Sequence, residues 1–173
     1  MKTTSLPKGA LVAGVVLLAW VPGLLAEGFI SDKPNVISFQ AVEAKLVRLV
    51  VNTTANGQVC IDEFEVYGPG TGNLALASAG AKASASSALQ GYPIHQIAHL
   101  NDGKYGNDRS WIAGGSTREW AQIELPKPAR IEKVVLSRDR SGRYRDRVPD
   151  SYEVRVSADG QKWTTVFRAN GIL

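Results

Sequence analysis

Short runs in which apolar and polar residues alternate recur along most of the chain. A period of two places successive side chains on opposite faces of a β-strand, so each run predicts a strand with one buried face. The runs are LVRLVV (46–51), FEVY (64–67), WAQIEL (120–125), IEKVVL (131–136), YEVRVS (152–157) and WTTVF (163–167).

Turn signals such as Asn56-Gly57, Asp102-Gly103 and Asp159-Gly160 separate these runs. No window predicts a long amphipathic helix, although residues 93–100 could form one or two helical turns. Many short strands joined by turns predict an all-β fold, an antiparallel β-sandwich or jelly roll. Residues 77–88 are small and polar, and we expect a long loop or a lightly packed strand there; a flexible linker is the alternative.

The first 26 residues have the pattern of a secretory signal. Lys2 and Lys8 precede an apolar stretch at 10–20, and Ala26 is a small residue suited to cleavage. The alternative is an uncleaved membrane anchor, against which the apolar stretch is short for a span of about 20 residues. We therefore predict a signal peptide at 1–26 and a secreted, cell-envelope or periplasmic protein with no membrane span after cleavage.

Charge and cysteine content narrow the classes of function. The chain has 20 basic and 16 acidic residues, and two of the lysines lie in the leader, so the mature net charge is 18 − 16 = +2. Such a balanced surface does not predict a nucleic-acid partner. Cys60 is the single cysteine, which excludes an internal disulfide. We expect a small buried thiol, since no basic partner that would activate it is evident nearby.

Four motifs in a fixed order resemble the discoidin family, also called the coagulation factor V/VIII type C domain. The motifs are NLALASAGAKASASS (73–87), HLNDGKYGNDRSWIAG (99–114), WAQIELPKPARIEKVVL (120–136) and DSYEVRVSADGQKWTTV (150–166). The resemblance implies a discoidin-like, galactose-binding-like jelly roll that binds a ligand without catalysis.

The two strands that normally close this family resemble AKLVRLVV (44–51) and IDEFEVYG (61–68), which here come before Asn73. We predict one circularly permuted domain, residues 27–173. In it 27–68 are the closing strands, 69–72 the joint, and 73–173 the opening and middle strands. The alternative is a truncated chain holding the tail of one domain and most of the next. An isolated two-strand piece is unstable in water and has open edges, which favours permutation.

The resemblance also implies a structural calcium ion beneath the ligand-binding loops. The matching side chains are Asp102 and Glu63, with oxygens of His99, Asn107 and Asp108 completing the shell of a hard cation. The alternative is that Asp102 only caps a turn and Glu63 is a solvated strand residue.

A zinc site is a second alternative in the same region. His95 and His99 are four residues apart, and Asp102 could be a third ligand if residues 93–100 are helical. Histidines that hydrogen-bond the backbone are the commoner outcome of such spacing.

The segment RDRSGRYRDR (138–147) is the main candidate for ligand binding. Arginine forks suit carboxylate, sulfate or phosphate groups, and a tyrosine ring can stack on a sugar. The candidate ligand-binding residues are Arg140, Arg143, Tyr144 and Arg145, with Tyr92 and Tyr105 as further exposed rings. The alternative is an exposed loop of mutually balanced Arg–Asp pairs. Trp111, Trp120 and Trp163 are assigned to the core.

No nucleophile elbow or phosphate loop is present in the sequence, and we do not predict an enzyme. The predicted function is a secreted, non-catalytic binding module. It would recognise a glycan or a cell-surface or matrix ligand through loops at one end of the sandwich. The alternative is a structural protein–protein interaction module of a larger exported assembly. An enzyme centred on His95, His99 and Asp102 ranks third.

Overall fold

A computed structural model describes residues 28–171, so the predicted signal peptide lies outside the described residues. The described part is built of strands and short 3₁₀ turns and contains no α-helix, which confirms the all-β prediction. The strands are β1 (Asn35–Thr54), β2 (Cys60–Ile61), β3 (Glu63–Tyr67), β4 (Lys82–Ala85), β5 (Trp111–Ile112), β6 (Glu119–Ser137), β7 (Pro149–Ser157) and β8 (Thr164–Ala169). The 3₁₀ turns are η1 (Ala77–Ala79), η2 (Ile97–Asn101) and η3 (Asn107–Arg109).

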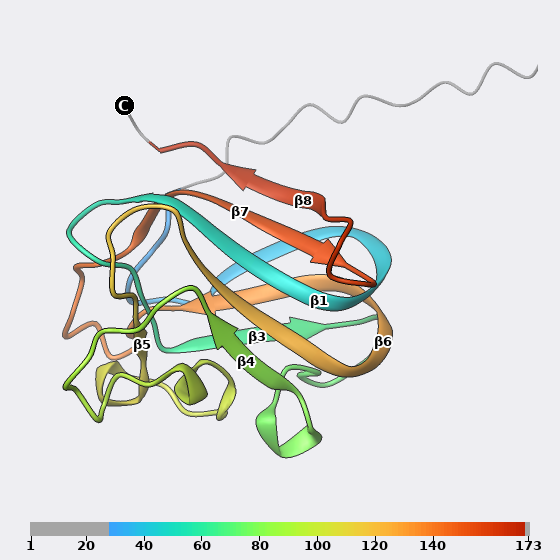
Figure 1. Cartoon of the computed structure of the whole chain (residues 1–173), viewed down its shortest axis with the longest axis horizontal. Coiled ribbons are helices and arrows are strands. Elements are labelled where there is room, and N and C mark those ends of the chain that lie inside the picture. Colours follow the sequence, from blue (N-terminus) through green and yellow to red (C-terminus); the bar gives the residue numbers. More distant parts are fainter. Residues whose placement is uncertain (1–27, 172–173) are drawn as a thin grey trace, which may run out of the picture.

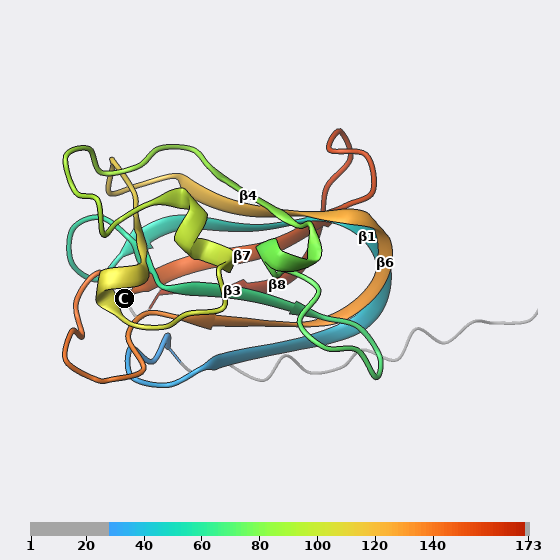
Figure 2. The ribbon, with the colours of Figure 1, turned by 90° about the horizontal axis from the view of Figure 1, so that it is seen from below.

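Two long strands, β1 and β6, connect the layers of the sandwich. The start of β1 pairs with the end of β6, and the end of β1 pairs with the start of β6, so the two strands run antiparallel along their whole length. Figure 2 shows both strands curving together from one layer into the other. WAQIEL and IEKVVL are therefore parts of a single strand, not the two strands that the sequence predicted.

The bend in β6 has a local cause. Pairing with β1 is interrupted between Ala44 and Leu46, and the exposed residues Pro126 and Pro128 lie opposite this interruption. Proline has no backbone N–H to donate to a ladder, so it is tolerated where pairing is already broken. An irregularity of this kind bends a strand without ending it.

The larger layer consists of β4, the first half of β6, the second half of β1, β7 and β8, and the smaller layer of β3 with the remaining halves of β6 and β1. Apolar side chains from both layers meet between them. The larger layer contributes Leu49, Ile123 and Val154, and the smaller one Phe64 and Leu136, all fully buried. The alternation read from the sequence therefore assigns the inward face of these strands correctly.

Residues before and after Asn73 share this core. β3 pairs with β6, and β1 pairs with both β6 and β7. The segment 77–88 forms η1 and β4, and β4 pairs with β6, so the expectation of a lightly packed strand is confirmed. The permutation of the family's strand order stays a prediction from the sequence.

The long loops gather at one end of the sandwich, opposite the bend of β1 and β6 (Figures 1 and 2). They are the loops 55–59, 86–118 and 138–148, which we call the loop end. Backbone hydrogen bonds tie two of them together, from the Ala55 N–H to the Val148 carbonyl and from the Cys60 N–H to the Arg147 carbonyl. The loop end is therefore a packed structure and not a set of independent turns.

Candidate functional site

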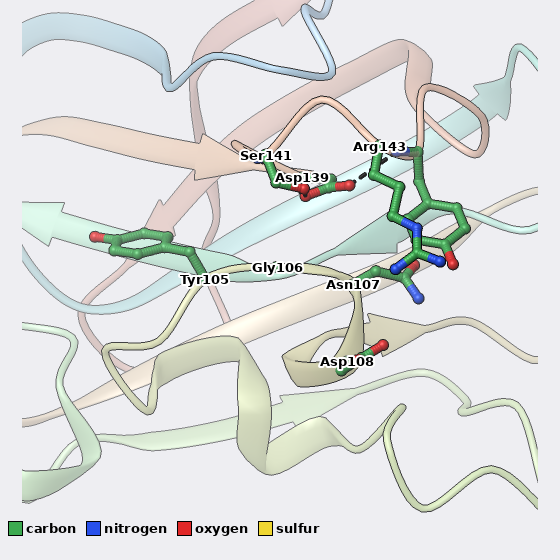
Figure 3. A pocket seen from close by; sticks show the side chains of 8 residues that line it. Tyr105, Gly106, Asn107, Asp108, Asp139, Ser141 and Arg143 are labelled. Atoms are coloured by element: carbon green, nitrogen blue, oxygen red, sulfur yellow. Dashed lines mark hydrogen bonds between the residues drawn. The ribbon is translucent and has the colours of Figure 1, made fainter.

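A pocket of about 190 Å³ opens at the loop end between the segment 105–108 and the segment 139–144 (Figure 3). Five of its lining residues belong to the candidate set read from the sequence. The lining residues are Tyr105, Gly106, Asn107, Asp108, Asp139, Ser141, Arg143 and Tyr144. The fold thus brings candidates from two distant parts of the chain to one place.

Asp139 organises one wall of the pocket. Its fully buried carboxylate accepts hydrogen bonds from the Ser141 N–H at 3.1 Å, the Ser141 hydroxyl at 2.6 Å and the Tyr144 N–H at 2.8 Å (Figure 3). Burial by itself raises the pKa of Asp139, but the hydrogen bonds from Ser141 and Tyr144 outweigh it, and the net pKa is lowered. The ionised carboxylate therefore holds the loop that carries Tyr144.

Arg143 and Tyr144 form the exposed part of that wall. The guanidinium carbon of Arg143 lies 5.4 Å from the centroid of the Tyr144 ring. In Figure 3 the Arg143 side chain points toward Asn107. Within residues 28–171 the other exposed arginine of this loop, Arg145, pairs with Asp32, whereas Arg143 has no carboxylate partner. The Arg143 guanidinium is therefore available to an anionic group in the pocket.

Arg138 links the two walls of the pocket through hydrogen bonds of its buried side chain. Its side chain is only 1% exposed, and it donates to the Asp146 carbonyl at 3.0 Å, to Asp146 Oδ1 at 2.9 Å and to Asn107 Oδ1 at 3.1 Å. Sequence reasoning missed this role because Arg138 is one of five arginines in a short run. Its position directly after the apolar end of β6 was the available signal.

Tyr105 faces a different group of charges. Its hydroxyl donates to Glu65 Oε1 at 3.1 Å, and the guanidinium carbon of Arg140 lies 3.7 Å from its ring centroid. Arg140 also forms an ion pair with the buried Glu65 carboxylate. In Figure 3 the Tyr105 ring points away from Asn107 and Asp108. Arg140 is thus neutralised within the protein, unlike Arg143.

Three of the candidate ligand residues lie outside the pocket lining: Arg140, Tyr92 and Arg145. Tyr92 is 53% exposed, and its ring packs at 6.0 Å, between centroids, against His95. Arg145 is 72% exposed and pairs with Asp32 at 3.3 Å. The structure brings none of the three side chains to the pocket lining.

The predicted cation ligands Glu63 and Asp102 come together although 39 positions separate them. Glu63 is fully buried, which overturns the alternative of a solvated strand residue, and it accepts the Gly103 N–H at 3.2 and 3.3 Å. Burial, followed by the charge of Asp102, raises the pKa of Glu63 to about 9. Asp102 itself caps its turn through the Lys104 N–H at 2.9 Å and pairs with Arg109.

A second buried carboxylate holds the same loop. Asp62 accepts the Gly106 N–H at 2.8 Å through Oδ2, and its Oδ1 has no hydrogen-bond partner among the described residues. Burial raises the pKa of Asp62 to about 6. Gly103 and Gly106 both have positive φ values, 77° and 107°, which side chains other than glycine rarely adopt. The adjacent acids Asp62 and Glu63 thus hold the backbone between residues 103 and 106.

A hard cation here would need oxygens of Glu63 and Asp102. The charge of Asp102 lies close enough to disfavour the ionisation of Glu63, and a cation between the two carboxylates would offset that repulsion. Within residues 28–171 no cluster of three or more histidine, cysteine or acidic side chains with metal-binding geometry occurs. Any cation here would therefore rely on loop carbonyls for part of its shell. The roles of His99, Asn107 and Asp108 in such a shell stay predictions.

The histidine pair does not form the zinc arrangement that was the alternative at the sequence level. Residues 93–100 do not form an α-helix: only η2 is helical, and His95 instead makes a bridge to Ser110. His95 Nδ1 lies 2.8 Å from the Ser110 hydroxyl, and His99 Nδ1 lies 3.1 Å from the Ile94 carbonyl. Burial, then the charge of Arg138, lowers the pKa of His95. Both rings therefore brace the loop by hydrogen bonds.

The core assignments from the sequence are partly confirmed. Trp111 is fully buried, and its indole N–H donates to the Ser87 carbonyl at 2.8 Å. Cys60 is buried, and burial raises the pKa of its thiol to about 11, which opposes a reactive thiolate. Trp120 and Trp163, in contrast, are partly exposed and flank Arg48, so placing them in the core was wrong. Trp120 precedes the inward-facing Ala121 and therefore points outward.

The family model of the F5/8 type C domain matches residues 82–172, more than half of the 173-residue chain. The chain belongs to this family, whose discoidin domains are typically non-catalytic binding modules, and no catalytic domain is identified. Neither the curated proteins nor the solved structures compared with the chain include a significant match. In the described part of the chain, no helix is long and apolar enough to cross a membrane.

Proposed function

We propose that this protein is a secreted or cell-envelope binding module that holds a glycan, or a similar cell-surface or matrix ligand, at its loop end. The observation that carries the proposal is the pocket between the segments 105–108 and 139–144. It combines a guanidinium without a carboxylate partner, an aromatic ring and polar loop groups at one opening. Such a mixture is suited to a hydroxylated or anionic ligand.

Each side chain has a distinct part in the proposed recognition. Arg143 would donate to a carboxylate, sulfate or hydroxyl group, and Asn107 and Asp108 line the opposite wall as hydrogen-bonding groups. The Tyr144 ring would stack on the apolar face of a sugar. Tyr105 is 43% exposed, but Arg140 lies over its ring and its hydroxyl is bonded to Glu65.

Calcium would brace the loops and take no part in chemistry. Glu63 and Asp102 would supply carboxylate oxygens, and a cation between them would compensate the buried charge that now raises the pKa of Glu63. The loop that Glu63 holds at Gly103 leads directly into the pocket wall. Bound calcium would thus stiffen the site at which the ligand docks.

A glycan array probed with the purified protein tests the proposal, first with calcium and then after chelation. Binding to a defined sugar class that Tyr144→Ala and Arg143→Gln abolish would support it. Arg145→Gln is the matched control, because Arg145 lies on the same loop but outside the pocket. A folded protein that binds no glycan, or whose binding survives both pocket substitutions, would refute the glycan assignment.

A protein partner is the second candidate. Tyr92 and Ile94 are both exposed on one segment of the loop end, at 53% and 41%. Exposed apolar side chains that lie close together are common at protein interfaces. The double variant Tyr92→Ser, Ile94→Ser would then lose partner binding while leaving any glycan binding unchanged. The opposite pattern would assign function to the pocket.

A further inference from the structure

The outward face of the larger layer carries a row of polar side chains at matching positions on five neighbouring strands. In order across β4, β6, β1, β7 and β8, the row is Ser84, Gln122, Arg48, Arg155 and Thr165. Neighbouring strands lie about 4.8 Å apart, so the row spans roughly 19 Å. None of these residues lines the loop-end pocket.

Arg48, at the centre of this row, lies between two tryptophans. Its guanidinium carbon is 4.5 Å from the ring centroid of Trp120 and 4.1 Å from that of Trp163. Nε and Nη2 donate to the Gln122 side-chain oxygen at 3.0 and 2.7 Å. These contacts hold the Arg48 side chain in one orientation. The two tryptophans and Gln122 that contact it are all partly exposed.

The charge of Arg48 is not neutralised by a carboxylate. Of the acids on this face, Glu153 pairs with Arg155 at 2.7 Å and with Arg168 at 3.0 Å, and Glu124 pairs with Lys45. Within residues 28–171 none of the ion pairs includes Arg48, which hydrogen-bonds only the neutral Gln122. Burial, and then the positive charge of Arg155, lowers the pKa of Arg48.

We propose that this face, centred on Arg48, is a second binding site that takes a linear polysaccharide bearing carboxylate or sulfate groups. The oriented guanidinium without a carboxylate partner supplies the recognition of an anionic group. The flanking indoles offer apolar surface to pyranose rings, and the hydroxyls and amide of the row can bond to sugar hydroxyls. The length of the row fits a chain better than a single sugar.

The stack of Trp120, Arg48 and Trp163 also stabilises the β7–β8 turn. Trp163 lies in that turn, and its indole N–H donates to the Gly160 carbonyl at 3.0 Å. A substitution of Arg48 could therefore loosen the turn as well as remove the charge. Arg155 provides a second variant, since it carries a positive charge in the same row and contacts neither indole among the cation–ring contacts of the described chain.

The test is affinity electrophoresis of the full protein through gels containing one polymer at a time. Polygalacturonate is compared with its fully methyl-esterified form, and dextran sulfate with dextran, so that carboxylate and sulfate are distinguished in matched pairs. The expected result is retardation by at least one acidic polymer and none by its neutral partner. Arg48→Gln should weaken binding about tenfold or more, and Arg155→Gln by about threefold, as expected for lost charged hydrogen bonds and weaker attraction. Arg145→Gln, which lies in neither proposed site, should leave it within about twofold.

Three results would overturn the proposal: no retardation by either acidic polymer, equal retardation by the neutral partners, or retardation that survives both Arg48→Gln and Arg155→Gln. Loss of binding with Arg143→Gln alone would also overturn it, by assigning the acidic polymer to the loop end. The glycan-array test depends on Tyr144 and Arg143, whereas this test depends on Arg48 and Arg155. Either proposed site can therefore be refuted without refuting the other.

Discussion

Arg138 and Arg48 lie in different parts of this domain, and their charges are stabilised by different kinds of contact. At the loop end, Arg138 is buried and donates to Asp146 and Asn107, which come from two separate loops. On the outer face of the larger layer, Arg48 lies between two indoles and bonds a neutral amide. The first charge is satisfied by directional oxygens, and the second mainly by aromatic surface.

The difference has a structural consequence. A buried charge whose partners lie on loops requires each loop to keep its position, because losing one partner leaves others without a donor or acceptor. A charge on a sheet face depends only on strand register, which the core already determines. We therefore expect substitutions at the loop end to destabilise the fold more than those on the sheet face.

The largest effect is expected for Arg138→Leu, which removes the group that joins the two loops. It should lower the free energy of unfolding by about 3 kcal/mol, the lower range for breaking a buried ion pair, because Asp146 is partly exposed and can be rehydrated. Urea unfolding measures this change. Arg145→Leu, on the same loop but mostly exposed, should stay within about 0.5 kcal/mol. Equal effects of the two substitutions would contradict the comparison.

The next effect is a pH dependence that calcium should reverse. Unfolded Glu63 loses its proton near its ordinary pKa of 4.5, whereas folded Glu63 keeps it up to about 9. The folded state therefore binds the extra proton between these values, and stability should fall as the pH rises through that range in the absence of metal. Thermal unfolding between about pH 5 and pH 9 would show this fall as a decrease in Tm.

Glu63→Gln is the matched variant for that measurement, since glutamine keeps an oxygen for the Gly103 N–H. It should flatten the pH dependence and abolish the rise in Tm that we expect calcium to produce in the original protein at pH 8. A calcium response that persists in this variant would remove Glu63 from the cation site.

A smaller effect is expected for Asp139→Asn, at the wall of the pocket. The substitution weakens the hydrogen bonds that Ser141 and Tyr144 donate, and it should lower the free energy of unfolding by about 1–2 kcal/mol. Because the pKa of Asp139 is lowered in the fold, its stabilisation is complete at neutral pH and is lost as the pH falls below the ordinary value of 3.8. The acid limb of the unfolding curve should therefore be shallower in the variant.

The smallest effect on stability is expected on the sheet face. Arg48→Gln loses two partly exposed cation–ring contacts, each worth roughly 0.5 kcal/mol. Urea unfolding should show a loss of about 1 kcal/mol or less. A loss as large as that of Arg138→Leu would mean that the Trp120–Arg48–Trp163 stack is essential to the fold.

Much of the fold could be predicted because one buried face constrains a strand strongly. Val47, Leu49 and Val51 occupy every second position of β1 and are buried, and a shift of one residue would expose them, so the alternation determines both strand and register. The curvature of β1 and β6 was missed, since Pro126 and Pro128 are equally consistent with the end of a strand. Trp120 was misplaced because it sits in a strand motif of the resembled family, although the position of Ala121 already indicated an outward direction.

The candidate ligand-binding residues stay a prediction, and the structure that supports them was missed. Tyr144 and Arg143 were chosen because a tyrosine ring can stack on a sugar and an arginine fork suits an anionic group. Arg138 and Asp139, which hold that loop, lie in a run that also contains exposed arginine and aspartate residues, and only burial distinguishes them. Burial of a polar side chain depends on which loops pack over it, and the local sequence does not encode that choice.

The sequence by itself determined the strands, the family and the residue types at the loop end, because alternation and motif order are local properties of a chain. The tertiary structure decided which charges are neutralised. Arg140 pairs with Glu65 and Arg138 pairs with Asp146. Arg143 and Arg48 have no carboxylate partner in the described part of the chain. The physical reason is that an ion pair requires closeness in space. These residues acquire their neighbours only when β1 and β6 fold the sandwich and bring the loops together.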